Sequence, residues 1–278
     1  MTWLIPAIIL SFGFAQLFKA SQRRGEYAPV VVSANYITLS LALGIYLTFA
    51  DQLAFSPAIF KVGASIGITF IASMLTMTYA LTISGAAPVI TAFRLSLLVP
   101  VALGIWIWDE PITATQLIGI ACAVTALALM TRNKSSAHHL HRSKAFLIIL
   151  AVFLIQGLGG TCLRWVHYAD LDPYRLNVLM IVGATAGLLG FSLILLRRKP
   201  IHKKDMYVGI SIGLYNAITL SVILTALSVV PGTLYFPVVG CSVVLLDNLF
   251  THIFWKEHLS RPAIAGVAMA VLAIVLVM

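Results

Sequence analysis

Charged residues are scarce in this sequence, and so are the long polar segments that a folded domain outside a membrane would need. Only 10% of the 278 residues are charged, whereas 60% are hydrophobic and the mean hydropathy is +1.01. An ordinary soluble domain carries about 25% charged residues, so the composition excludes a soluble globular protein. At roughly 20 apolar residues per crossing, ten spans would occupy about 200 residues and leave only short loops. We therefore expect an all-α polytopic membrane protein.

Patterns that bind metals or carry out catalysis are also missing. The three cysteines, Cys122, Cys162 and Cys241, lie far apart in apolar segments without a C-x-x-C motif, so neither a disulfide framework nor a zinc site is indicated. The histidine cluster at 138–141 has no partner ligand of fixed geometry and is interpreted as a solvated loop. The sequence contains neither H-E-x-x-H nor paired carboxylates within its apolar segments. We therefore expect no enzyme, no bound metal and no cofactor.

Apolar runs bounded by charges, proline and glycine predict ten membrane-spanning helices. These helices are expected at about 3–19, 29–49, 58–83, 87–107, 113–131, 144–163, 174–196, 205–229, 233–254 and 260–278. The connections from Ser84 to Ala86 and from Val230 to Gly232 are so short that each predicts a tight antiparallel hairpin. No charged segment precedes the first apolar run, which is therefore predicted to be a retained span and not a cleaved signal peptide.

Segments of the first half recur in the second half in the same order, which is typical of an internal repeat. The segment at 62–68 matches that at 208–214 at five of seven positions, and the Trp-x-Glu segment at 108–110 recurs at 255–257. The two offsets are 146 and 147 residues. Both copies of the first segment carry the Gly-x-x-x-Gly spacing that lets membrane helices pack closely. These glycines are Gly63, Gly67, Gly209 and Gly213.

The repeat divides the chain into residues 1–132 and 144–278, joined by the basic loop 133–143. Each half contains five predicted helices, an odd number, so the second half must cross the membrane in the opposite direction to the first. Fourteen of the 18 Lys and Arg residues then fall on one side of the membrane. They are Lys19, Arg23, Arg24, Arg132, Lys134, Arg142, Lys144, Arg197, Arg198, Lys199, Lys203, Lys204, Lys256 and Arg261. The positive-inside rule places this side in the cytoplasm and both termini outside, so the basic excess marks orientation and not nucleic-acid binding.

Over essentially its whole length the chain resembles the EamA-type ten-helix exporters of the drug/metabolite transporter superfamily. The resemblance rests on Lys19-x9-Pro29, the Ala87-Pro88 hairpin and the Glu-x-[Ile/Leu]-[Thr/Ser]-x5-Gly pattern that closes each half. Lys19 with Pro29 also has a counterpart in Arg164 with Pro173. The resemblance implies a bacterial-type plasma (inner) membrane protein with a central cavity between the halves, lined mainly by helices 1, 3, 4, 6, 8 and 9. It also implies alternating access by rocking of helix hairpins. Two features depart from the family, namely the outside termini and a first helix without the Trp-Gly that many relatives carry.

Arg94 and Asp247 are the two charges that lie inside apolar segments, where a charge costs about 2.5–3.5 kcal/mol on insertion scales. Each is interpreted either as a substrate ligand or as one half of a structural ion pair. The predicted helix midpoints place both at nearly the same depth, and mutual compensation is the simplest way to retain them. They would then form either a gate or a clamp, in which Arg94 binds a substrate carboxylate and Asp247 binds its amine.

Other polar side chains on the expected cavity helices are candidates for orienting a substrate, or for hydrogen bonds between helices. They are Gln16, Tyr79, Gln156, Tyr215, Asn216 and Tyr235. Asn248 and His252 lie four apart beside Asp247, and His252 is also interpreted as an interfacial residue at a helix end. A carboxylate and a histidine at this place leave proton coupling open. Glu110 and Glu257 are interpreted as residues that anchor the fifth and tenth helices, and not as substrate ligands.

The predicted function is a secondary transporter or exporter of a small polar metabolite, such as an amino acid or related zwitterion, an amine or an organic anion. Buried charges near the midplane of an inverted repeat are the arrangement that alternating access uses. The alternatives are a lipid-carrier flippase subunit and a membrane partner that transports nothing. The expected partners are the small-molecule substrate and membrane lipid, with the chain acting as a monomer or a homodimer.

The basic loops predict a topology that labelling can test. A cysteine introduced at Ser136, in a variant whose native cysteines are replaced, should react with an impermeant thiol reagent only from the cytoplasmic side. Labelling of intact cells from outside would reverse the predicted orientation and place both termini in the cytoplasm.

Overall fold

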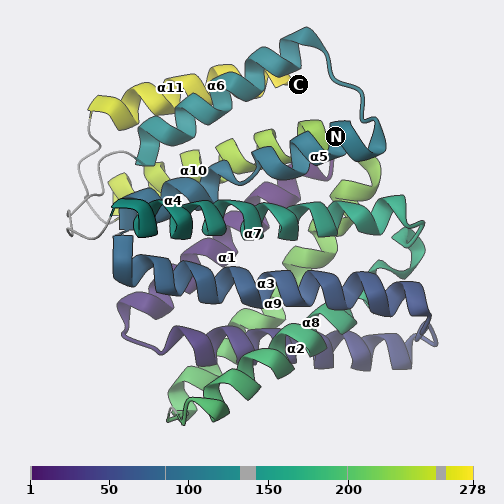
Figure 1. Cartoon of the computed structure of the whole chain (residues 1–278). Helices are drawn as coiled ribbons and strands as arrows, with labels where there is room; N and C mark the ends of the chain where they lie inside the picture. Colours follow the sequence, from purple (N-terminus) through teal and green to yellow (C-terminus); the bar gives the residue numbers. More distant parts are fainter. Residues whose placement is uncertain (1, 85, 132–141, 199, 255–260, 278) are drawn as a thin grey trace. The chain divides into compact units, whose positions relative to one another are not determined.

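A computed structural model shows a chain that is helical along most of its length (Figure 1) and describes residues 2–84, 86–131, 142–198, 200–254 and 261–277. These residues form eleven α-helices and one short 3-10 helix, with no strand among them. The first half contains α1 (Leu4–Arg23), α2 (Ala28–Phe49), α3 (Pro57–Ser84), α4 (Ala86–Leu95), α5 (Leu98–Trp108) and α6 (Ala114–Thr131). The second half contains α7 (Arg142–Tyr168), η1 (Asp172–Tyr174), α8 (Arg175–Leu196), α9 (Lys203–Val229), α10 (Gly232–Phe254) and α11 (Arg261–Val277).

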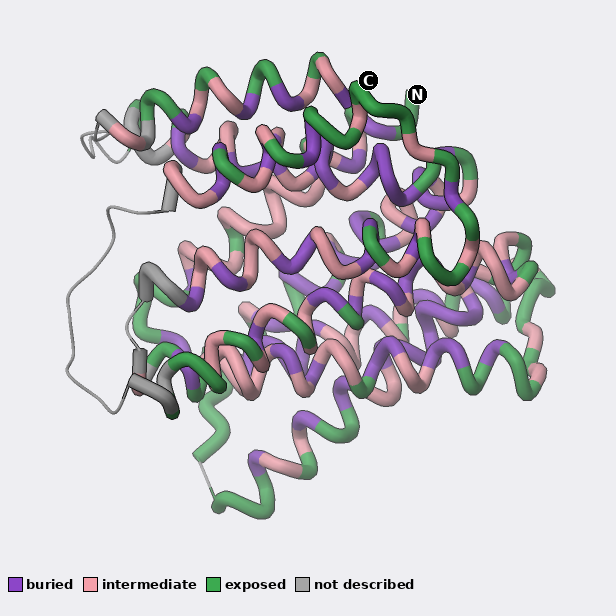
Figure 2. Tube along the Cα trace, turned by 45° about the horizontal axis from the view of Figure 1, so that its top comes forward, coloured by how far each residue is buried: buried purple, intermediate pink, exposed green. Residues whose placement is uncertain are grey.

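The helices have the length and the surface of membrane-spanning segments. Among the described residues, eight helical segments are long and apolar enough to cross a membrane, and α6 and α11 contain shorter apolar helices. Figure 2 shows exposed positions alternating with buried ones along the helices. Many of the exposed positions are large and apolar, such as Phe49 at 89% and Trp106 at 81% exposure. Soluble proteins rarely expose so much apolar surface, which is typical of a surface in contact with lipid.

Nine of the ten predicted runs each coincide with one helix, and their ends differ from the prediction by at most five residues. The predicted helix over 87–107 is the exception, because the chain forms two helices there, α4 and α5. Helix α3 ends at Ser84 and α4 begins at Ala86, whereas α9 ends at Val229 and α10 begins at Gly232.

The helices pack as two compact units, and each unit draws on both halves of the sequence. Unit 1 comprises Met1–Ile71 and Trp165–Val229, and unit 2 comprises Ala72–Arg164 and Val230–Met278. Helices α3 and α7 contribute residues to both units. The compact units therefore differ from the predicted repeats, each of which supplies helices to both units.

Glycines bring the helices of unit 1 together. The most extensive contact in this unit joins α2 to α8, and α9 also packs on α2. A methyl group added at Gly213 of α9 would lie 2.6 Å from the Asn35 carbonyl oxygen of α2. One added at Gly67 of α3 would lie 2.9 Å from the Val182 carbonyl oxygen of α8. The repeated glycines thus lie where α9 meets α2 and where α3 meets α8, at distances that leave no room for a side chain.

Helix α8 carries a second close-approach element that the sequence analysis did not single out. A methyl group at Gly183 would lie 2.6 Å from the Tyr36 carbonyl oxygen, and one at Gly187 would lie 2.9 Å from the Ile37 nitrogen. Both contacts are with α2, and the two glycines have the same four-residue spacing as the repeated pairs. This spacing accounts for the extensive contact between α2 and α8.

In unit 2 the most extensive contact joins α6 to α11, which run side by side in Figure 1. Small buried side chains line this contact, because alanines from both helices belong to one apolar core cluster. They are Ala123, Ala126, Ala270 and Ala273. A methyl group at Gly119 of α6 would lie 2.7 Å from a methyl carbon of Val277. Small residues therefore let α6 and α11 approach closely in unit 2, as glycines do in unit 1.

Several helices end where an aspartate adopts the left-handed backbone conformation. Asp51, Asp109 and Asp170 have φ angles of 53°, 49° and 55° and lie just after α2, α5 and α7. Aspartate tolerates this conformation better than most residues because its short polar side chain can form local hydrogen bonds. These residues end a helix and turn the chain toward the next one.

We expect the contact between α9 and α2 to fail when a methyl group is added to it. Gly213→Ala should lower the melting temperature of the detergent-solubilised protein, because overpacking against a backbone carbonyl costs about 1–3 kcal/mol. Gly44→Ala in α2 is the matched control, because its methyl group would lie 3.4 Å from the flexible Met180 side chain. Both substitutions gain the same helix propensity, about 1 kcal/mol. An equal effect of the two variants on stability would contradict the close packing at Gly213.

Candidate functional site

The fourth predicted span is interrupted next to its charged residue. Helix α4 ends at Leu95 and α5 begins at Leu98, so Ser96 and Leu97 form a break directly after Arg94. Pro100 explains the break, because proline has no N–H to donate to the carbonyl four residues earlier. The Ser96 carbonyl instead accepts a hydrogen bond from the Val99 N–H, at 3.0 Å. A proline inside an apolar run thus divides a span that hydropathy predicts as one helix.

Arg94 and Asp247 belong to unit 2 and interact with each other. Arg94 lies in the last turn of α4, Asp247 lies on α10, and both residues are half-buried. The Asp247 carboxylate has a favourable electrostatic interaction with the Arg94 guanidinium. The two charges that the apolar sequence must accommodate therefore offset each other in part.

Glycines from two other helices surround the break between α4 and α5. A methyl group at Gly240 of α10 would lie 2.9 Å from a methyl carbon of Leu97. One at Gly157 of α7 would contact Val99 and would lie 2.9 Å from the Ser96 carbonyl oxygen. The break is therefore packed between α7 and α10 at positions where only glycine fits. If α4 and α5 bend at this point, they would move against α7 and α10 at positions that carry no side chain, Gly157 and Gly240.

The other predicted polar residues of unit 2 differ in their surroundings. Asn248 is buried and donates from Nδ2 to the Val244 carbonyl of its own helix at 2.9 Å. Gln156 accepts a hydrogen bond from the Ser73 hydroxyl, which joins α7 to α3. Tyr235 is buried at 3% exposure, whereas Tyr79 is 59% exposed. Gln156 and Asn248 thus have partners within the protein, and of these residues Tyr79 is the one that is exposed.

Gln16, Tyr215 and Asn216 belong to unit 1, so the predicted site residues divide between the two units. Asn216 is buried at 3% exposure, and Gln16 and Tyr215 are half-buried. The Tyr215 hydroxyl occupies the space that a side chain at Gly13 of α1 would need. The side chain of His252 and all of Glu257 lie outside the described residues.

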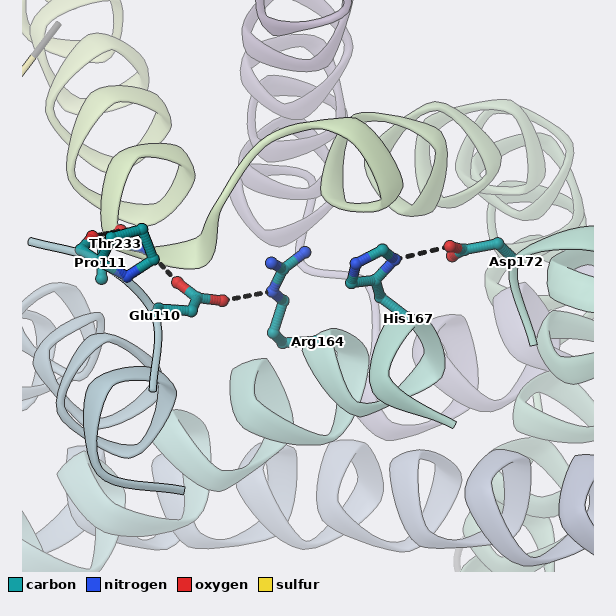
Figure 3. A network of polar contacts seen from close by, with 6 residues as sticks. All are labelled: Glu110, Pro111, Arg164, His167, Asp172 and Thr233. Atoms are coloured by element: carbon teal, nitrogen blue, oxygen red, sulfur yellow. Dashed lines mark hydrogen bonds and ion pairs between the residues drawn. The ribbon is translucent and has the colours of Figure 1, made fainter. Parts of the chain in front are cut away.

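The most buried ion pair that the structure describes joins Glu110 to Arg164 within unit 2 (Figure 3). Arg164 donates from Nε to Glu110 Oε1 at 2.6 Å, and the two side chains are only 4% and 2% exposed. Glu110 lies in the connection between α5 and α6, and Arg164 lies near the end of α7. The helix predicted over residues 144–163 ends one residue before Arg164, and this boundary is wrong. Helix α7 continues to Tyr168, which places Arg164 within the helix and buries it.

The other carboxylate oxygen of Glu110 caps helix α10. Glu110 Oε2 accepts a hydrogen bond from the Thr233 backbone N–H at 2.9 Å, and the Gly232 N–H also donates to this carboxylate. The first N–H groups of a helix have no partner within it, so a carboxylate at this position satisfies them and complements the helix dipole. Methyl groups at Gly104 or Gly232 would lie 3.3 Å from the carboxylate, which leaves it little space to move.

The contacts of Glu110 have opposing effects on its pKa. Burial raises the pKa, whereas the Thr233 N–H, the Arg164 guanidinium and the Gly232 N–H lower it, and the net shift is downward. Glu110 is therefore a fixed carboxylate that anchors α5, α7 and α10, and it has no proton to exchange near neutral pH.

A close contact between a histidine and an aspartate lies in unit 1, three residues further along α7. His167 Nδ1 and Asp172 Oδ2 are 2.6 Å apart, and their side chains are 35% and 30% exposed. Figure 3 shows the two side chains pointing toward each other. His167 belongs to the last turn of α7 and Asp172 begins η1, so the contact fixes the turn between α7 and α8.

No family model matches the chain. It is similar to an uncharacterized protein of Haemophilus influenzae, with 22% identity over 284 residues that cover 98% of this chain and 95% of the relative. It is also similar to a solved crystal structure of another protein, with a TM-score of 0.79 and 13% sequence identity. That alignment covers 99% of this chain and 94% of the other. The helical arrangement is thus shared with a solved protein, and at this identity the likeness concerns the fold alone.

Glu110→Gln should destabilise the protein strongly, because it removes the carboxylate charge that lies 2.6 Å from the buried Arg164 guanidinium. The expected loss is about 3–5 kcal/mol, which corresponds to a drop of roughly 10 °C in melting temperature. Asp109→Asn is the matched control, because Asp109 is the exposed neighbour and asparagine tolerates its left-handed backbone. If the two variants melt at the same temperature, the Glu110 pair does not hold unit 2 together.

The same carboxylate predicts a loss of stability in acid. The folded-state pKa of Glu110 lies below its unfolded value of about 4.3. Its contribution is therefore fully present above that value and is lost as the pH falls through the lower folded pKa. Between about pH 5 and pH 3 the melting temperature should fall less steeply for Glu110→Gln than for the unmodified chain. Parallel melting curves over this range would contradict the assignment.

Proposed function

We propose that the chain is a secondary transporter of a small polar metabolite, such as an amino acid or related zwitterion, an amine or an organic anion. The observation that carries the proposal is the interaction of Arg94 with Asp247, on two segments that are long and apolar enough to span a membrane. Opposite charges retained within such segments are typical of substrate or ion pathways, because each alone opposes insertion. A protein that needed only stability would gain more from apolar residues at these positions.

The broken span supports this proposal. Transporters commonly build their sites from discontinuous helices, because a break exposes backbone groups and permits movement. Here the break at Ser96 and Leu97 follows Arg94 directly, and Gly157 and Gly240 leave smooth surfaces on both sides of it. A change in the α4 to α5 angle would therefore move Arg94 relative to Asp247, which is the kind of movement that alternating access requires.

We further propose ten spans arranged as two inverted repeats, in a bacterial-type plasma membrane with both termini outside. Helix packing supports the repeats, because α2 packs on α8 and α6 packs on α11, and each pair consists of equivalent helices of the two halves. The repeated glycines support them as well, since α3 meets α8 through Gly67 and α9 meets α2 through Gly213. A pseudo-twofold relation between the halves generates paired contacts of this kind. The resemblance to EamA-type exporters is part of the same proposal.

A thermal-shift screen of purified protein against amino acids, amines and organic acids should identify a stabilising solute. Uptake of that solute into proteoliposomes that contain this chain alone would support the transporter proposal. A chain that binds or moves none of these solutes would overturn it, and would favour a non-transporting partner or a lipid-carrier flippase subunit.

Substitutions at the charged pair separate a clamp from a gate. If Asp247 binds a substrate amine, Asp247→Asn should weaken the affinity for amine-bearing solutes by roughly tenfold or more. If the pair is a gate, Asp247→Asn should change the transport rate and leave affinity unaltered. The double exchange of Arg94→Asp with Asp247→Arg should restore the stability that the single substitutions lose, whether the pair is a clamp or a gate. It should restore transport only if the pair is a gate. Asp51→Asn, at an exposed carboxylate, is the control. Unchanged stability and transport after both single neutralisations would show that the pair has neither role.

A further inference from the structure

The turn between α1 and α2 places a carboxylate in the interior of unit 1. Gly25 has a φ of +74°, a conformation that glycine adopts without strain, and the Glu26 N–H donates to the Ser21 carbonyl at 3.3 Å. This turn reverses the chain directly after Arg24, and the Glu26 side chain is 0% exposed. Glu26, which belongs to the connection between α1 and α2, thus has a completely buried side chain.

A second carboxylate lies beside it, on the first turn of α9. Asp205 is 4% exposed, and its Oδ1 accepts a hydrogen bond from the Tyr27 backbone N–H at 3.3 Å. Because Tyr27 follows Glu26 directly, this bond brings the two acids to the same place. Both line one open pocket of about 590 Å³, together with His202 and Lys204.

Three of the four carboxylate oxygens accept no hydrogen bond from the residues that the structure describes. They are Glu26 Oε1, Glu26 Oε2 and Asp205 Oδ2, and all three are buried. Lys204 Nζ lies 3.6 Å from Glu26 Oε1, which is an ion-pair distance but is too long for a hydrogen bond. The Lys204 side chain is also 65% exposed, so it remains largely in solvent.

Buried acceptors without donors are unfavourable, because the carboxylates have lost water and gained little in return. The helix dipole of α9 favours the Asp205 carboxylate, which lies in its first turn. Glu26 precedes the N-cap residue of α2, but its carboxylate oxygens accept no hydrogen bond from the described backbone N–H groups of that helix. Two carboxylates and one lysine leave one negative charge in the pocket. Lys203 and Arg24 are exposed near this site, where solvent screens their repulsion of a cation.

We infer that Glu26 and Asp205 form a binding site for a compact monovalent cation, either a sodium ion or the ammonium group of a primary amine. Such a cation supplies the charge that balances the pocket, and it satisfies oxygens that can only accept. Lys204 then acts as the resident competitor, whose ammonium group approaches the same oxygens when the cation is absent. The inference does not depend on transport, because it concerns binding at a site in unit 1, whereas Arg94 and Asp247 belong to unit 2.

The test is the melting temperature of the purified full-length chain at pH 7 and constant ionic strength, with choline chloride replaced stepwise by sodium chloride or methylammonium chloride. The quaternary ammonium of choline donates no N–H, and its methyl groups keep the positive charge away from the carboxylate oxygens, so choline serves as the inert cation. We expect a saturable rise of about 3 °C with at least one of the two probes. A rise with sodium alone identifies an inorganic ion, and a rise with methylammonium alone identifies an amine.

Variants assign the effect to this pocket. Glu26→Gln and Asp205→Asn should each shift the midpoint of the titration at least tenfold toward higher cation concentration, whereas Asp51→Asn at an exposed acid should not. Lys204→Met should shift the midpoint toward lower concentration, because it removes the competing ammonium group. Because Lys204→Met keeps both carboxylates, its shift of the titration midpoint still tests the pocket if Glu26→Gln or Asp205→Asn fails to fold. Melting temperatures that do not respond to either probe, in both the unmodified chain and Lys204→Met, would overturn the inference and leave Glu26 and Lys204 as a structural pair. A cation response in a chain that transports nothing would leave it intact.

Discussion

The carboxylate of Glu110 is the constraint on which the packing of unit 2 depends. It accepts from Arg164 of α7 and from the first N–H groups of α10, and its own backbone belongs to the connection between α5 and α6. This carboxylate lies 2.6 Å from the buried Arg164 guanidinium, and breaking such a pair is costly because a buried ion loses its partner. One side chain thus fixes the ends of three helices, and the break between α4 and α5 lies among those same helices.

Two pairs of charged residues in unit 2 differ in burial. Glu110 and Arg164 are almost completely buried, close together and fixed by several hydrogen bonds. Arg94 and Asp247 are half-buried, and Arg94 directly precedes a helix break. A fully satisfied buried pair resists movement, whereas a partly exposed pair can exchange its partner for a solute or for water at a smaller energetic cost. The first pair therefore suits an anchor, and the second suits a site that changes during a functional cycle.

The helices could be predicted from the sequence because each apolar run is long and its ends are marked by charge, proline or glycine. The break at Ser96 and Leu97 was missed because Pro100 lies within an uninterrupted apolar run, where a kink and a break have the same hydropathy. The burial of Arg164 was missed because a charge near the end of an apolar run was taken as the start of a loop, whereas the helix continues past it. The inward turn of Glu26 depends on the backbone of Gly25 and on contacts with α9, which no local pattern reveals. The glycine pairs at 63–67 and 209–213 could be singled out because they recur, whereas Gly183 and Gly187 occur once.

The proposed repeats duplicate packing but do not duplicate the charges of Arg94 and Asp247. With the offset of 147 residues that aligns Trp108 with Trp255, Arg94 corresponds to Cys241 and Asp247 corresponds to Pro100. If the halves were equivalent in charge as well as in shape, the inward-open and outward-open states of an inverted repeat would have equal energy. An arginine carried by one half and an aspartate carried by the other make the two states unequal, because each state places the charges at a different depth and distance. In the proposed transporter the duplicated glycines would supply a symmetric framework for movement, and the unduplicated charges would decide which state is favoured and which solute changes that preference.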